Sequence, residues 1–232
     1  MTIQKFEQLV LNELATIVSD IIESNLSLNI PVKGRQDAEI SDWLEEQFIT
    51  HTKSHLKFSN SVAAPKNKTK NPWDVKTYFN LNKSYKEEIW IDFKAFDVLR
   101  ANSNPKIGTP NKMLNLISQG GFYLTYIYVY YQKSDSGMQF VKHNNSYVKC
   151  YFLKDVNSSF YRDSTNQLQV NFNKEPQYRT RSEFINLLRN KLRESYSRQI
   201  ERLENEKNGL DALFDTIEER NSSAENTLIN NL

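Results

Sequence analysis

Residues 74–81 (Asp-Val-Lys-Thr-Tyr-Phe-Asn-Leu) and residues 88–96 (Glu-Ile-Trp-Ile-Asp-Phe-Lys-Ala-Phe) decide the fold of this chain. Apolar and polar residues alternate in both stretches, which is typical of β-strands whose two faces meet different surroundings. The turn-prone residues 82–87 join them, so the simplest arrangement is an antiparallel hairpin. We predict this hairpin and place the rest of the sequence around it.

Helical patterns flank the hairpin, and further strands follow it. Apolar residues recur every three or four positions in residues 2–26 and 37–55, which predicts two amphipathic helices. Residues 122–132 and 147–156 are rich in tyrosine, valine and phenylalanine and predict two central strands. A long helix is expected over residues 181–220.

The segments between these elements are polar. Residues 59–71 predict a basic loop, and residues 101–121 a long connection with a short helix around residues 113–117. We expect one domain over residues 1–232. It is composed of an N-terminal helix within residues 1–30, a core over residues 31–175, a long helix over residues 180–220 and a frayed polar tail over residues 221–232.

Composition excludes several classes of protein. The net charge is only +2, so binding to nucleic acid would depend on local clusters of charge. Cys150 is the single cysteine, which rules out an internal disulfide and a cysteine-rich zinc site. The sequence has neither a membrane-length apolar run nor the pattern of a signal peptide, so we expect a cytoplasmic protein.

The chemistry is concentrated on the predicted hairpin. Asp92 and Lys94 are two positions apart on a strand, so their side chains leave the same face. If the two strands pair, Asp74 reaches the same region of space. Two carboxylates beside a lysine suit Mg²⁺, which takes one or two carboxylates and completes its shell with water and phosphate oxygens. The lysine would orient the attacking water and stabilise charge on phosphorus.

These residues resemble the motif of the PD-(D/E)xK nuclease superfamily, specifically of type II restriction endonucleases. Pro72 and Asp74 match the first half and residues 92–94 (Asp-Phe-Lys) match the second, although Trp73 separates the proline from the aspartate. The resemblance implies an α/β fold with a restriction-endonuclease-like core, in which helices flank a mixed central β-sheet. It also implies site-specific, Mg²⁺-dependent hydrolysis of double-stranded DNA by an activated water.

Other expectations follow from the same resemblance. Mn²⁺ is expected to substitute for Mg²⁺, and the enzyme is expected to act as a homodimer on a palindromic site. A cognate DNA methyltransferase is expected in the same restriction-modification system, without forming a stable complex. The family also tends to place a glutamate on a helix before the hairpin; Glu39 is the candidate here, with Glu45 and Glu46 as alternatives.

Three polar segments are candidate DNA contacts because their side chains bind phosphates or base edges. The candidate positions are Lys66, Lys68 and Lys70 in the first segment, Asn102, Asn104, Lys106, Thr109, Asn111 and Lys112 in the second, and Arg179 and Arg181 before the long helix.

Two other functions remain open at this stage. One is a non-catalytic DNA-binding or assembly module, in which Asp74, Asp92 and Lys94 form a structural ion network. The other is a repair or degradation nuclease of the same superfamily. The long helix shows a heptad-like spacing from Tyr196 to Ile217, which is as compatible with packing on its own domain as with a two-fold helical interface.

Overall fold

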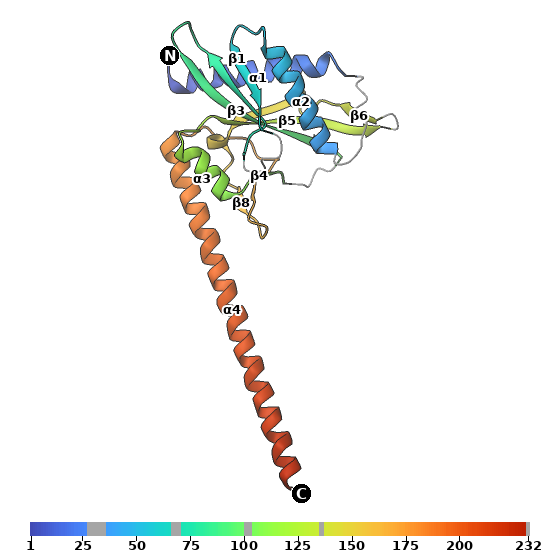
Figure 1. Cartoon of the computed structure of the whole chain (residues 1–232), viewed down its shortest axis with the longest axis vertical. Coiled ribbons are helices and arrows are strands. Elements are labelled where there is room, and N and C mark those ends of the chain that lie inside the picture. The colour runs from blue at the N-terminus through green and yellow to red at the C-terminus, as the bar shows by residue number, and fades with distance from the viewer. Residues whose placement is uncertain (27–35, 66–70, 100–103, 135–136, 231–232) are drawn as a thin grey trace. The chain divides into compact units, whose positions relative to one another are not determined.

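The computed structural model describes residues 1–26, 36–65, 71–99, 104–134 and 137–230. It divides the chain into two compact units, Met1–Ile185 and Asn186–Leu232, which are described separately below. Helices α1 (Ile3–Glu23) and α2 (Gln36–Thr52) and all the named strands belong to the first unit (Figure 1).

A six-stranded mixed sheet forms the centre of the first unit. Its strand order is β1-β2-β3-β5-β6, and β7 also pairs with β5. Strands β3 and β5 are parallel, whereas the other pairs are antiparallel. The strands are β1 (Phe58–Ala63), β2 (Val75–Asn80), β3 (Lys86–Asp97), β5 (Leu124–Ser134), β6 (Gly137–Phe140) and β7 (Val148–Phe152).

The predicted hairpin is confirmed as β2 and β3. Val75 lies opposite Ile91 and Asn80 lies opposite Lys86, so the strands pair without interruption between these positions. The short turn between the strands keeps the pairing local in sequence, which explains why the alternating pattern predicted it correctly.

Helices α1 and α2 cover one face of the sheet and form the main apolar core with it (Figure 1). The odd-numbered apolar residues of β3 and β5 point into this core, because successive side chains of a strand alternate between faces. The core includes Val10, Leu14, Ile21, Leu44, Phe48, Ile89, Ile91, Phe93, Ile127 and Val129.

Aromatic side chains cover the opposite face. The rings of Phe96 and Phe172 stack with their centroids 3.9 Å apart, and those of Tyr128 and Tyr151 stack at 5.7 Å. The chain crosses this side between β3 and β5 through β4 (Lys106–Gly108) and helix α3 (Pro110–Ser118). A small sheet forms there from β4, β9 (Leu168–Gln169) and β8 (Tyr161–Arg162), in that order. The mixed central β-sheet with flanking helices that was expected from the sequence is therefore present.

The structure corrects two predicted segments of the first unit. Part of the predicted basic loop over residues 59–71 is strand β1, because Phe58 is buried and the hydroxyl of Ser61 bonds with those of Thr52 and Thr77. The strand predicted over residues 147–156 is shorter, since residues 153–155 form a 3₁₀ helix, η1.

Helix α4 (Arg181–Asn230) begins in the first unit and forms the second. The predicted capping box is present: the backbone N–H groups of Thr180 and Glu183 each donate to the other residue's side chain. The helix continues to residue 230, beyond the predicted end at residue 220. None of the helices in the described ranges has the length and apolar character needed to cross a bilayer.

A buried ion cluster links α1 to the segment that follows β7. The ammonium of Lys154, which is 1% exposed, lies 2.8 Å from carboxylate oxygens of both Glu7 and Asp155. It also donates to the Arg179 carbonyl at 2.8 Å and lies 4.3 Å from the centroid of the Tyr178 ring. Burial raises the pKa of both carboxyl groups, and Lys154 opposes this effect by favouring their charged forms.

Removing the lysine alone should therefore destabilise the protein. We expect Lys154→Met to lower the free energy of unfolding by about 3–5 kcal/mol, because two buried acids lose their shared cation. Adding Glu7→Leu should recover part of this loss. Urea denaturation measures both changes. Lys57→Met, which breaks the more exposed pair with Glu13, is the control and should change stability by less than about 1 kcal/mol. Equal losses for the two lysine variants would contradict the role assigned to the cluster.

Candidate active site

Two backbone contacts place Asp74 next to Asp92. The N–H of Asp74 donates to the carbonyl of Ile91 at 2.7 Å, and the N–H of Phe93 donates to Asp74 Oδ2 at 2.7 Å. These contacts lie on either side of Asp92 in β3, so the carboxylate of Asp74 is held beside that residue. Asp74 therefore lies beside Asp92, as the predicted hairpin led us to expect.

Asp92 and Lys94 form an ion pair on the aromatic face of the sheet. Lys94 Nζ lies 2.7 Å from Asp92 Oδ1, with the Asp92 residue 6% exposed and the Lys94 side chain 29% exposed. Asp92 lies beside Tyr126 and Lys94 beside Tyr128 on the parallel strand β5. The carboxylate is thus enclosed by protein, while the lysine reaches the solvent boundary.

The two carboxyl groups strongly influence each other. Burial and the negative charge of Asp92 raise the pKa of Asp74 to about 8, against the opposing effects of Lys94 and the Phe93 N–H. Burial also raises the pKa of Asp92, while Lys94 and a hydrogen bond with Asp74 act in the opposite direction. Near neutral pH the pair therefore holds a proton that a bound cation would have to displace.

Glu45 is the helical acid that lies near this pair. The hydroxyl of Ser41 on α2 donates to the Phe93 carbonyl at 3.2 Å, which fixes one face of the helix against β3. Glu45 is four residues further on and shares that face. Its negative charge contributes to the raised pKa of Asp74. Glu39 is two positions from Ser41 and has one buried carboxylate oxygen, whereas Glu46 is exposed.

The oxygen atoms of Asp74 and Asp92 fit a hard divalent cation. The negative charge of Asp92 raises the pKa of Asp74, and a cation between the two acids would relieve this repulsion. Over the described ranges, no group of three or more His, Cys, Asp or Glu side chains is arranged to hold a metal. A pair of carboxylates matches Mg²⁺, which usually retains several waters, better than it matches zinc with its nitrogen and sulfur ligands.

Several predicted DNA contacts lie on the crossover between β3 and β5. Asn104 and Asn111 are exposed. Lys106 forms an ion pair with Asp163 at 3.4 Å, yet half of its side chain remains exposed. The predicted contacts at Lys66, Lys68, Lys70 and Asn102 lie outside the described residues.

The first turn of α3 lies close enough to the two aspartates to change the pKa of Asp92. Thr109 caps this helix by accepting a hydrogen bond from the Lys112 N–H at 3.4 Å. The positive charge of Lys112 lowers the pKa of Asp92. The sequence identified Thr109 and Lys112 as polar loop residues but gave no signal that the crossover brings Lys112 toward the catalytic strand.

The two predicted arginine contacts are engaged within the protein. Arg179 Nη1 donates to the carbonyls of Val156 and Gln177, and Arg179 Nη2 donates to the Gln177 side chain. The Arg181 guanidinium lies about 5 Å from the ring centroids of Phe122 (4.9 Å) and Tyr123 (5.0 Å). Both arginine side chains therefore have partners within the protein, and their contact with DNA stays a prediction.

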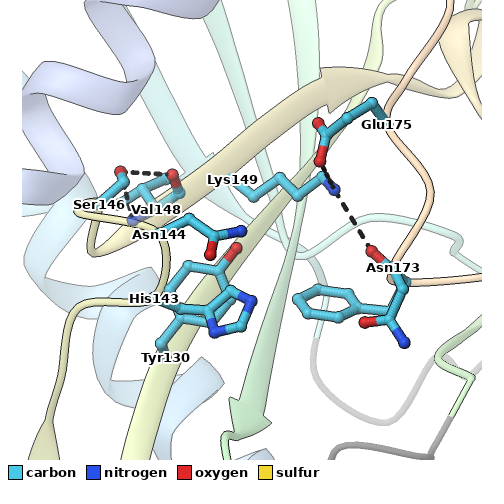
Figure 2. A pocket seen from close by; sticks show the side chains of 9 residues that line it. Tyr130, His143, Asn144, Ser146, Val148, Lys149, Asn173 and Glu175 are labelled. Atoms are coloured by element: carbon cyan, nitrogen blue, oxygen red, sulfur yellow. Dashed lines mark hydrogen bonds and ion pairs between the residues drawn. The ribbon is translucent and has the colours of Figure 1, made fainter.

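A separate pocket of about 210 Å³ lies on the aromatic side of the sheet (Figure 2). Tyr130 and His143 lie close together in it, and Lys149 bonds to Glu175 at 3.1 Å. The residues lining this pocket do not include Asp74, Asp92 or Lys94, so it is distinct from the acidic pair.

Comparison with known proteins identifies a family of restriction endonucleases. The chain matches the family model described as SwaI-like, SwaI restriction endonuclease, over residues 2–210. A search of curated proteins finds no match. Among solved structures the chain is similar to the NlaIV restriction endonuclease, with 15% identity and a TM-score of 0.45, over 82% of this chain and 79% of that one. The family match spans nearly the whole chain, including the hairpin and both acids: this protein belongs to the SwaI-like restriction endonuclease family and is a site-specific DNA endonuclease.

Proposed function

We propose that this chain hydrolyses double-stranded DNA at a specific sequence with Mg²⁺ held by Asp74 and Asp92. The observation that supports this most directly is the convergence of the two carboxylates beside Lys94, whose Nζ lies 2.7 Å from Asp92 Oδ1. The proposal assigns a chemical role to each of the three groups, whereas a purely structural ion network would leave the repulsion between the acids without a function.

Asp74, Asp92 and Lys94 would each have a distinct chemical role in the hydrolysis. A bound Mg²⁺ would supply a water of lowered pKa and neutralise charge on the scissile phosphate. Asp74 would give up its proton and hold the cation through its carboxylate together with Asp92. Lys94 donates hydrogen bonds toward the attacking water and the non-bridging phosphate oxygens, where negative charge grows as the water oxygen bonds to phosphorus and the ester bond breaks. Its partial exposure places it at the edge that DNA would approach.

Glu45 is proposed as a positioning residue for this site in place of Glu39. Its charge reaches Asp74 from α2, so it would strengthen cation binding and orient a water in the metal's shell. Asn104, Lys106, Asn111 and Lys112 are the proposed DNA contacts within the described residues, with Lys112 nearest to the catalytic acids. Two copies acting on a palindromic site would present the same surfaces to each half-site.

The catalytic assignment predicts loss of cleavage without loss of fold. We expect Asp92→Ala and Lys94→Ala each to reduce the rate of DNA cleavage by at least about 10²–10³-fold, because each removes a group that stabilises the transition state. Wild-type protein with Mg²⁺ should cut a sequenced plasmid into discrete fragments, which mapping of the fragment ends would verify. Random smearing would point to a degradative nuclease, and full activity in either variant would refute the assignment.

The two candidate helical acids can be separated by a matched pair of variants. We expect Glu45→Gln to weaken Mg²⁺ binding and cleavage by about 10-fold or more, since it removes a charge acting on the site. Glu39→Gln, on the same helix, should leave both close to the wild-type values. Isothermal titration measures metal affinity independently of cleavage. If Glu39→Gln weakened Mg²⁺ binding and cleavage more than Glu45→Gln did, Glu39 would be the positioning residue instead.

The raised pKa of Asp74 predicts how stability depends on pH in metal-free protein. Its folded pKa of about 8 exceeds the ordinary aspartate pKa of 3.8, so the ionised form is disfavoured in the folded state. The stability that the folded protein gains from protonated Asp74 is fully present below about pH 4, and it is lost as the pH rises through about 8. We therefore expect the Tm of wild-type protein to fall by roughly 5 °C or more between pH 5 and pH 8 relative to Asp74→Asn. Saturating Mg²⁺ should abolish this difference for the wild type.

Thermal denaturation in buffers of matched ionic strength provides the measurement. Asp42→Asn, which changes an exposed acid on α2, is the control and should keep the wild-type pH profile. If the Tm of Asp74→Asn changed with pH in the same way as the wild-type Tm, the Asp74 carboxyl would not be the group that holds the proton.

A further inference from the structure

The hairpin formed by β8 and β9, residues 161–169, has a buried base and an exposed polar tip. Leu168 is 1% exposed, so the base of the hairpin is anchored in the protein interior. Ser164, Thr165 and Asn166 at the tip are exposed. In Figure 1 the hairpin extends past β4, away from the central sheet. The β8–β9 hairpin therefore presents a polar tip to solvent from a fixed base.

Asp163 holds the tip in one conformation. Its Oδ1 atom accepts hydrogen bonds from the N–H groups of Thr165 at 2.9 Å and Gln167 at 2.8 Å. Its Oδ2 atom accepts a hydrogen bond from Gln169 Nε2 at 2.7 Å and lies 3.4 Å from Lys106 Nζ. One carboxylate thus joins both sides of the turn to a lysine on β4. A loop fixed in this way loses little conformational entropy when it binds a partner.

Arg162 and Asn166 form a polar pair at the tip. Arg162 Nε donates a hydrogen bond to Asn166 Oδ1 at 2.7 Å. Asn166 has a φ of 61°, a left-handed conformation that asparagine tolerates better than most residues and glycine adopts freely. A guanidinium recognises guanine and a side-chain amide recognises adenine at base edges in the major groove. The tip therefore carries, in a fixed arrangement, two kinds of group that distinguish bases.

The hairpin is attached to the element that covers the catalytic strand. Strand β9 pairs with β4, where Lys106 lies opposite Gln169. The hydroxyl of Tyr126 on β5 donates to the Ile107 carbonyl of β4 at 2.9 Å. Tyr126 lies beside Asp92 on the neighbouring strand. Because Tyr126 fixes β4 to the face of the sheet that carries Asp92, it also fixes the hairpin on the side of the protein where DNA would meet the acids.

The form of the hairpin suits one groove of DNA. The major groove of B-DNA is about 12 Å wide and admits a two-stranded β-ribbon, whereas the minor groove is about 6 Å wide. Residues 161–169 form such a ribbon, and their single acid, Asp163, is paired with Lys106. The chain belongs to a family of site-specific endonucleases, and sequence is read mainly at base edges in the grooves. Double-stranded DNA is therefore the partner that the hairpin fits.

We propose that the β8–β9 hairpin enters the major groove of DNA bound at the catalytic acids, where Arg162 and Asn166 contact base edges. Asp163 is a positioning residue that holds these two side chains in place. The role of the hairpin rests on the function proposed above, because it needs a duplex bound next to Asp74 and Asp92. It adds to that function the segment that reads the sequence.

The test measures sequence selection separately from cleavage. Wild-type protein, with Ca²⁺ in place of Mg²⁺, selects duplexes from a random pool, and the sequence recovered defines the cognate duplex. Arg162→Lys keeps the charge but loses the planar fork, and Asn166→Gly keeps the left-handed turn but loses the amide. We expect each to lower affinity for the cognate duplex by about 10–100-fold, and affinity for a scrambled duplex by less than about 3-fold. Fluorescence anisotropy measures both affinities.

Two further comparisons test the positioning role and the specificity of the effect. Asp163→Ala should lower cognate affinity by a similar factor, whereas Asp163→Asn keeps an acceptor oxygen for the tip N–H groups and should retain most of the affinity. Lys83→Ala is the control, because it removes an exposed charge on the turn between β2 and β3, at the end of that hairpin remote from Asp74. It should bind both duplexes like the wild type.

The outcomes separate the reading role from the catalytic one. Equal losses on the cognate and scrambled duplexes would mean that the tip contacts phosphates alone, and this would overturn the proposal. Unchanged cognate affinity in both tip variants, or a wild type that recovers no sequence, would also overturn it. A wild type that selects a sequence but does not cleave it with Mg²⁺ would refute the proposed catalysis alone. Discrete cleavage by wild type and both tip variants, at equal rates and sites, would refute the role of the hairpin alone.

Discussion

The paired hydrogen bonds between residue 74 and strand β3 are the constraint on which the active site depends. One runs from the Asp74 N–H to Ile91 and the other from the Phe93 N–H to the Asp74 carboxylate, each at 2.7 Å. Together they hold a second acid beside Asp92, although burial and like charge both oppose that position. The fold stabilises this arrangement through the core beneath the hairpin, where Ile91 and Phe93 pack against the helices. The free energy of that core offsets the unfavourable placement of the acids.

The features that the sequence predicted well are local ones. Alternation within residues 74–81 and 88–96 places Asp92 and Lys94 on one face, and pairing of adjacent strands then brings in Asp74. The capping box at Thr180 and Glu183 is equally local, because both partners lie within one helical turn. In each case the contact is determined by residues close together in the chain, so periodicity and turn chemistry are sufficient.

What the sequence did not reveal depends on contacts between distant segments. Strand β1 is polar, and its assignment rests on pairing with β2 and on the burial of Phe58. The preference for Glu45 over Glu39 follows from how α2 docks on β3 through Ser41, a contact that spans 52 residues. Arg179 was predicted to contact DNA, and the sequence did not indicate that its guanidinium donates to the Val156 carbonyl after β7. Neither composition nor spacing encodes these tertiary contacts.

The parallel pairing of β3 with β5 has a consequence for the order in which the protein folds. The hairpin needs only a short loop to close, whereas β5 can join β3 only after the crossover through β4 and α3 is in place. Closing the longer loop costs more conformational entropy, so the acidic hairpin should form before Tyr126 and Tyr128 enclose it. The two carboxylates would then meet first in water, where their repulsion is screened, and become buried only as the sheet is completed.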